Sequence, residues 1–352
     1  MKENQKPTKK IPIKDKKLRI YILIGMLAFI LALVKIGLDV FISNVKVEQE
    51  TYITVRGVKD MDEFLGKLEY SNYLNNFVSF KRLANWVQLE TKMKPGRYLL
   101  KKGMSNFDIL KLLMQGRQVP MDIVFKYAER IENVCGFFGR KLEPDSLSLL
   151  DLFKDTSIIH PMGFDTNTII AMFIPNTYNF YWNTHRMAFM NRMHAEYKKF
   201  WNAQRLSKAL QMHMSKNEIS TLASIVQKES NKREEMPIIA GVYLNRLKLG
   251  MPLQADPTVI YAWHDPSIRR VLSMHTALES PYNTYMVKGL PPGPICAPSI
   301  QAIDAVLNYA EHNYIYFCAR EDFSGYHSFA ATFAQHQVNA RRYQKAISGG
   351  SN

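Results

Sequence analysis

The stretch Ser215-Lys-Asn-Glu-Ile-Ser-Thr-Leu-Ala-Ser-Ile-Val-Gln-Lys-Glu-Ser230 carries the clearest structural signals in the chain. Ser215 and Glu218 stand at the spacing of a capping box, which predicts that a helix begins here. Apolar residues then recur at i, i+3, i+4 and i+7 and form one face, namely Ile219, Leu222, Ala223 and Val226. Because each residue turns a helix by roughly 100°, Glu229 falls on this apolar face, whereas Gln227 and Lys228 point elsewhere.

A carboxyl group on a core-facing stripe is unusual. When it is partly desolvated it keeps its proton to a higher pH than a surface glutamate does, and a general acid needs this property. Glu229 is therefore the candidate catalytic residue. The helix pattern by itself leaves a second interpretation open, in which Glu229 is a surface residue at a fraying helix end.

The N-terminal region predicts a membrane anchor. Residues 1–19 are rich in lysine, and an apolar run follows over residues 20–42, interrupted by Lys35 and Asp39. A span needs about 20 residues, and Lys35 can extend its charge toward the far interface. The positive-inside rule places residues 1–19 in the cytoplasm and everything after residue 43 across the membrane. A cleaved signal peptide is the competing interpretation, but no small-x-small cleavage site follows the apolar run, so we favour an uncleaved anchor.

Composition limits the classes of function. With 352 residues the chain has room for two or three domains. A good part of its net charge of +15 lies in the N-terminal tail, and the rest suits an anionic extracytoplasmic partner such as cell-wall polymer or lipid headgroups. The part of the chain after the apolar run contains no basic stripe interleaved with aromatic residues, so nucleic-acid binding is not predicted. Cys135, Cys296 and Cys318 have no metal-ligand spacing, although one disulfide pair is possible, and His327 and His336 lack a third ligand, so we expect no metal and no cofactor.

Local patterns predict an α+β fold. The expected strands are 51–55, 95–100, 121–126 and 314–319, and the expected helices are 62–68, 73–86, 103–116, 128–142, 145–153, 186–208, 215–229, 237–250, 299–309 and 329–347. Ser105 should cap the helix that Gly116 ends. Segment 173–182 is expected to be an aromatic loop that either stacks on sugars or packs as a buried turn.

Three further segments, 253–261, 280–285 and 289–295, are predicted to be loops fixed by proline and glycine. Their polar side chains are suited to line a cleft for a hydroxyl-rich ligand, namely Gln254, Asp256, Tyr282, Asn283 and Thr284.

Taken in order, several of these motifs resemble one family. Leu222–Ser230, Val242–Leu247, Leu253–Tyr261, Ser280–Tyr285, Gly289–Ile295 and His327-Ser-Phe329 are similar to motifs of the endolytic murein transglycosylases, the MltG/YceG-like family. The resemblance implies a cytoplasmic tail (1–19), one transmembrane helix (20–42), a LysM-like α/β module (47–120) and a mixed α/β catalytic domain (121–346). It places the protein in the inner membrane as a single-pass protein whose catalytic domain is periplasmic or extracytoplasmic.

The resemblance also implies a reaction. Glu229 maps onto the family's catalytic glutamate, and Gln227 stands where relatives often carry a second one. Glu229 would cut the bond between N-acetylmuramic acid and N-acetylglucosamine in peptidoglycan and leave 1,6-anhydro ends, which would end growing strands. Gln254, Asp256, Tyr282, Asn283, Thr284, Asn245 and His327 would bind substrate.

Penicillin-binding proteins would be partners on this interpretation. Two alternatives stay open: a non-catalytic peptidoglycan-binding scaffold protein, and a muramidase that uses Asp256 as a second carboxylate.

Overall fold

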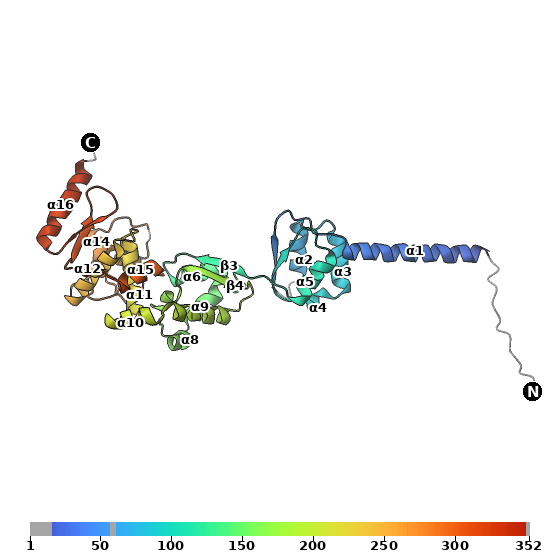
Figure 1. Ribbon diagram of the computed structural model, residues 1–352, viewed down its shortest axis with the longest axis horizontal. Coiled ribbons are helices and arrows are strands. Elements are labelled where there is room, and N and C mark those ends of the chain that lie inside the picture. Colours follow the sequence, from blue (N-terminus) through green and yellow to red (C-terminus); the bar gives the residue numbers. More distant parts are fainter. Residues whose placement is uncertain (1–15, 57–60, 266, 350–352) are drawn as a thin grey trace, which may run out of the picture. The chain divides into compact units, whose positions relative to one another are not determined.

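The computed structural model describes residues 16–56, 61–265 and 267–349 (Figure 1). Its contacts divide the chain into two compact units. The first lies within residues 1–120 and includes 181–183, and the second lies within 121–180 and 184–352. The predicted basic tail falls outside the described residues except for 16–19, which begin the first helix.

Helix α1 (Lys16–Phe41) contains the predicted span. Its segment Lys17–Phe41 is long and apolar enough to cross a membrane, judged by length and composition, and the side chains of residues 17–36 are exposed rather than packed in a core. The helix begins four residues before the predicted start, since lysine and leucine are good helix formers and continue the helix into the basic flank.

The end of α1 is joined to the first unit by a buried amide network. Asn106 Nδ2 donates to the Asp39 carbonyl (2.8 Å) and to Ser79 Oγ (3.0 Å), and its Oδ1 accepts from Asn44 Nδ2 (2.6 Å). Asn44 and Asn106 are buried, so these bonds replace the water that the helix end would otherwise need.

The first unit places helices against a two-stranded antiparallel sheet. Strands β1 (Thr51–Val55) and β2 (Gly96–Leu100) pair with Thr51 opposite Leu100. The helices are α2 (Met61–Tyr70), α3 (Phe77–Trp86), α4 (Leu89–Lys92) and α5 (Asn106–Gln115). Helix α5 has the predicted Ser105 cap, in a capping box with Asp108, and ends at Gly116, whose φ of +70° suits glycine.

The second unit holds one large core and short sheets. Its strands are β3 (Met121–Phe125), β4 (Asn176–Phe180), β5 (Tyr316–Ala319) and β6 (His327–Ala330), which pair as antiparallel β3–β4 and β5–β6. Its helices are α6 (Ile131–Gly139), α7 (Ser146–Lys154), α8 (Thr156–Ile159), η2 (His160–Met162), η3 (Ile169–Met172), α9 (Arg186–Phe200), α10 (Ala203–Gln211), α11 (Lys216–Glu229), α12 (Met236–Lys248), α13 (Asp256–Trp263), α14 (Ser273–Thr276), α15 (Ile300–Leu307) and α16 (Phe333–Gly349).

Helix α11 confirms the capping-box prediction and is buried more completely than predicted. Ser215 and Glu218 form both bonds of the box, and the four residues of the predicted apolar face are fully buried. Ser220, Thr221 and Ser224 are buried as well. Their hydroxyl groups donate to backbone carbonyls within the helix at 2.7–2.8 Å, which satisfies them without water.

The predicted loop 173–182 is wrong, because Asn176–Phe180 forms strand β4. Tyr178 and Phe180 alternate with polar residues and are buried, so the packed interpretation holds for these rings. The predicted helix 186–208 is also wrong as one element. It divides at Trp201 into α9 and α10, because the Asn202 side chain accepts from Arg205 N–H and caps a new helix.

Two predictions near the C-terminus need correction. The predicted loop 253–261 forms helix α13 from Asp256 onward, where Pro257 occupies the first turn and lacks the N–H that a first turn leaves unpaired. The predicted helix 329–347 begins only at Phe333, since His327–Ala330 pairs with β5.

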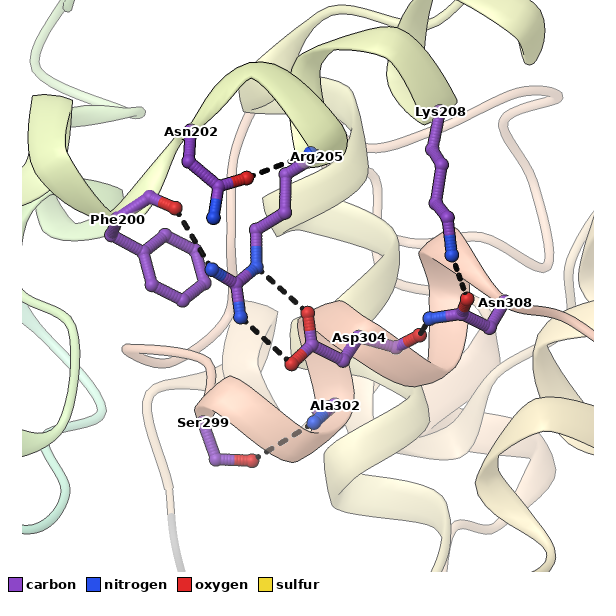
Figure 2. A network of polar contacts seen from close by, with 8 residues as sticks. All are labelled: Phe200, Asn202, Arg205, Lys208, Ser299, Ala302, Asp304 and Asn308. Atoms are coloured by element: carbon purple, nitrogen blue, oxygen red, sulfur yellow. Dashed lines mark hydrogen bonds and ion pairs between the residues drawn. The ribbon is translucent and has the colours of Figure 1, made fainter.

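An ion pair joins α10 to α15 and supports the packing around α11. Figure 2 shows the Arg205 guanidinium bound through two nitrogens to the Asp304 carboxylate, at 2.8 and 2.9 Å. Arg205 also donates to the Phe200 carbonyl (3.0 Å) and lies over the Phe200 ring. Helix α15 in turn packs along α11.

We predict that Arg205→Ala lowers the free energy of unfolding by about 1–2 kcal/mol, because a bidentate, partly buried pair and a ring contact are lost together. The matched control is Lys208→Ala, on the same helix, where an exposed bond to Asn308 should cost at most about 0.5 kcal/mol. Chemical denaturation of the detergent-solubilised protein measures both. Equal effects would contradict a structural role for the Arg205–Asp304 pair.

Candidate active site

Glu229 is the last residue of α11 and has a defined partner. The Tyr243 hydroxyl on α12 donates to Glu229 Oε1 at 2.7 Å. The next residue, Ser230, adopts an extended backbone, so the helix ends at the carboxyl group itself. The side chain keeps partial access to solvent, which a group that acts on a ligand requires.

The surroundings of Glu229 raise its pKa to about 7. Desolvation by the surrounding protein is the largest cause, and the negative charge of Asp256 adds to it. The Tyr243 hydrogen bond and the positive charge of Arg246 act in the opposite direction, because both stabilise the carboxylate. Near neutral pH the group is therefore present in both forms, as an exchange of protons in both directions demands.

Helix α12 supplies two residues that the sequence reasoning did not select. Tyr243 is buried, and burial together with the neighbouring Glu229 raises the pKa of its phenol well above the usual value, so it stays a neutral donor. Arg246 lies one turn further and donates to the carbonyls of Ile315 (2.7 Å) and Leu253 (2.8 Å). The spacing Tyr243–Arg246 on one helix face was the available signal.

Asp256 stands at the start of α13 and accepts a hydrogen bond from the Tyr285 hydroxyl (2.5 Å). Its side chain is exposed, and its charge acts on Glu229. Glu229, Tyr243, Arg246, Asp256 and Tyr285 form a set that we call the Glu229 cluster. It brings together two carboxyl groups in different surroundings, one desolvated and one exposed.

Three other predicted ligand-binding residues shape the loop beside the cluster. Gln254 is exposed and adopts a left-handed backbone (φ +52°), and its N–H donates to the Thr284 carbonyl. Thr284 is buried, and its hydroxyl accepts from Ala255 N–H (3.0 Å). Asn283 is buried, and its amide donates to the carbonyls of Thr276 and Leu278. Asn283 and Thr284 therefore build the loop with groups that were expected to face a ligand.

The remaining predicted residues lie around this cluster. Tyr282 packs against Tyr261 with ring centres 4.9 Å apart, and Asn245 donates to the carbonyls of His312 and Tyr314. His327 contacts Glu235 through its N–H (2.8 Å) and through Nδ1 (3.0 Å). Glu235 is 4% exposed and also accepts from Ser230 Oγ, so it links His327 to the residue after Glu229.

Gln227 has a partner of its own on another element. Its Oε1 accepts from Ser299 N–H at 2.6 Å and joins α11 to the cap of α15. Within residues 16–56, 61–265 and 267–349, no group of three or more His, Cys, Asp and Glu side chains is arranged to hold a metal ion. Cys135, Cys296 and Cys318 are free thiols.

Comparison with known proteins shows the family of this chain. The model of the YceG-like family matches residues 53–342. The chain belongs to the YceG-like family.

Curated relatives carry the name endolytic murein transglycosylase. The protein from Streptococcus pneumoniae serotype 2 (strain D39) is 27% identical over 303 residues, which are 76% of this chain and 54% of that protein. The protein from Bacillus subtilis (strain 168) is 38% identical over 135 residues, 37% of each chain. The chain thus spans about half the length of the pneumococcal relative, and its match covers a smaller share, 37%, of the Bacillus one.

The crystal structure of a YceG-like protein from Listeria monocytogenes has the same fold. It matches with a TM-score of 0.56 at 24% identity, over 83% of this chain and 99% of that one. The family and the YceG-like fold predicted from the motifs are therefore confirmed, together with a mixed α/β architecture.

The raised pKa of Glu229 has a thermodynamic consequence. A carboxyl group whose pKa is higher in the folded state ionises more readily after unfolding, so the protein loses stability as the pH rises from 4.5 to about 7. We predict that Glu229→Gln stabilises this YceG-like protein by up to about 3 kcal/mol above pH 7, and little below pH 4.5. Denaturation of both proteins between pH 4 and 8 measures the difference.

The control is Glu279→Gln, which removes an exposed negative charge from the same unit. A gain for Glu229→Gln that is constant with pH would contradict the raised pKa.

Proposed function

We propose that the protein is a membrane-anchored endolytic lytic transglycosylase that cleaves the bond between N-acetylmuramic acid and N-acetylglucosamine in peptidoglycan strands. The observation that carries the proposal is Glu229, a partly accessible carboxyl with a pKa near 7, at a fixed position in a YceG-like chain. The names of the curated relatives support the same substrate.

In the proposed reaction Glu229 acts first as an acid. Since Oε1 accepts from Tyr243, we assign the transferred proton to Oε2, from which it passes to the glycosidic oxygen as the bond to the anomeric carbon breaks. The charge of Arg246 and the Tyr243 hydrogen bond stabilise the carboxylate that forms. Positive charge develops meanwhile at the anomeric carbon of the muramic residue.

Glu229 then acts as a base. The carboxylate takes the proton from the 6-hydroxyl group of the same muramic residue, whose oxygen bonds to the anomeric carbon. This closes a 1,6-anhydro ring and returns the proton to Glu229, so no water is consumed. A second carboxylate to activate water is therefore unnecessary.

The exposed residues of the neighbouring loops are proposed to bind the sugars. Gln254, Asp256 and Tyr282 are at least partly accessible, and Tyr285 orients Asp256. Asn245, Asn283, Thr284 and His327 are proposed to act indirectly, because their polar atoms hold neighbouring segments in place.

The rest of the chain suits this role. Residues 47–120 are proposed to form a LysM-like glycan-binding module, supported by a cavity of about 180 Å³ lined by Tyr52, Thr54 and Tyr73 beside β1. Residues 121–346 would be the catalytic domain. Anchored by α1 in the inner membrane, the enzyme would terminate nascent strands beside penicillin-binding proteins. A non-catalytic scaffold is disfavoured, since a binding module has no need of a carboxyl with a raised pKa.

The products of peptidoglycan cleavage test the proposal. We predict that mass spectrometry finds fragments with 1,6-anhydro ends, that Glu229→Gln abolishes their release, and that Asp256→Asn reduces it modestly. Reducing ends, with equal losses in both variants, would instead support a muramidase that uses two carboxylates. No release by a folded protein that still binds glycan would support the scaffold.

Membrane orientation is a separate prediction. Because basic residues precede the apolar helix, protease added to spheroplasts should digest the part after residue 43 and spare the N-terminal tail. An N-terminal epitope tag follows the tail on blots. Digestion of the tag with protection of the remainder would reverse the orientation, and loss of residues 1–42 from the mature protein would indicate a cleaved signal peptide.

A further inference from the structure

A second cavity lies in the same unit as the Glu229 cluster. Of its lining residues, only Tyr261 lies in one of the predicted site motifs. It has a volume of about 320 Å³ and is bordered by the ends of η3, α6, α7 and α13. Its lining combines an apolar base of Phe153 and Ile170 with the charged side chains of Arg130, Glu132 and Lys154.

Two connections join the elements that border this cavity to the Glu229 cluster. Tyr261, which lines it, lies five residues after Asp256 on α13, a rise of about 7.5 Å along the helix. In addition, Lys228, the residue before Glu229, pairs with Glu129, the residue before Arg130, at 3.8 Å. When the glycosidic bond of a ligand lies at Glu229, a short branch of that ligand can therefore extend toward this cavity.

The cavity is poorly suited to a further sugar ring. Arg130 lies 4.0 Å over the Tyr261 ring and donates to the Tyr261 carbonyl, while Tyr282 packs on the same ring from 4.9 Å. The ring that would stack on a sugar is thus already in contact with protein. The lining offers two cations and one carboxylate over an apolar base, and such a surface suits a peptide that carries carboxylates.

The charged rim can be rearranged at little cost. Lys154 and Glu132 lie 3.5 Å apart with 56% and 51% of their side chains exposed, so their pairing contributes little to stability. A ligand carboxylate can therefore take the place of Glu132 beside Lys154.

Asn167, which also lines the cavity, has a closely packed backbone. The Asp165 carboxylate accepts from the backbone of Asn167 (2.9 Å), and a Cβ atom on Gly293 would lie 2.2 Å from the Asn167 carbonyl. Close backbone packing thus joins the Gly289–Ile295 motif to this cavity.

We propose that the cavity binds the acidic stem peptide carried by the lactyl group of the muramic residue at the cleavage site. This assignment rests on the proposed function, since it takes peptidoglycan as the ligand of the Glu229 cluster. Lys154 and Arg130 provide positive charge for the peptide carboxylates, and the partly exposed Ile131, which also lines the cavity, contacts its aliphatic side chains. The protein thereby recognises strands that still carry stems.

The test measures binding to the full-length Glu229→Gln protein in detergent, which does not consume the ligand. The probes are a disaccharide–pentapeptide and the same disaccharide without peptide, titrated by calorimetry. We expect the peptide-bearing probe to bind about tenfold more tightly. Adding Lys154→Glu should remove this preference and leave the affinity for the bare disaccharide unchanged.

The matched control is Lys198→Glu, an equal change of charge at an exposed position on α9 outside the cavity, which should preserve the preference. Equal affinity for the two probes, binding of neither, or an equal loss of both in Lys154→Glu would overturn the assignment. A preference that depends on Lys154, in a protein whose active form releases no 1,6-anhydro ends, would support the peptide site and overturn the proposed reaction alone.

Discussion

The burial of residues 219–226, the middle of α11, is the constraint on which the second unit depends. Elements α12, α13 and α15 pack against it, and even its serine and threonine side chains face protein. This burial is tolerable because each hydroxyl bonds to a carbonyl of the same helix and brings no unpaired polar atom into the core. Because eight successive residues, 219–226, are buried, α11 cannot shift without disturbing its neighbours, and this restricts the position of Glu229 at its end.

The buried surroundings that hold Glu229 in place also disfavour its charged form. Desolvation opposes its ionisation, and a core made for stability alone would place an apolar residue there. Tyr243 and Arg246 offset part of the cost because both favour the carboxylate, and they keep the pKa near 7 instead of higher. A pKa of about 7 allows one group to release and accept a proton near neutral pH.

The sequence was informative where local chemistry decides the structure. The capping box at Ser215 and the cap at Ser105 predicted where α11 and α5 begin, and the helical period placed Glu229 at the end of the apolar face. Strand β4 was missed because two of its five residues, Asn176 and Asn179, are asparagines, and asparagine usually indicates a loop. The break at Trp201 was missed because one capping residue, Asn202, overrides a continuous helical pattern.

The composition of the site was harder to predict, because it arises from tertiary contacts. Tyr243 meets Glu229 only because α12 folds back beside α11. Asn283 and Thr284 were expected to face a ligand, since amide and hydroxyl groups bind sugars. A loop without regular structure must also satisfy its own buried backbone, and these two side chains do so.

The two carboxyl groups of the cluster illustrate how surroundings separate similar side chains. Glu229 is desolvated and bonded to a phenol that stays neutral, whereas Asp256 is exposed and held by Tyr285. A hydrolase would need the second group to activate water, but a nucleophile built into the substrate needs only to be held near one base. Under the proposed reaction, precise placement of the muramic residue therefore matters more than a second catalytic charge. A binding site for the branch next to the reacting ring would provide that placement, because it fixes the ring that carries both the breaking bond and the attacking hydroxyl group.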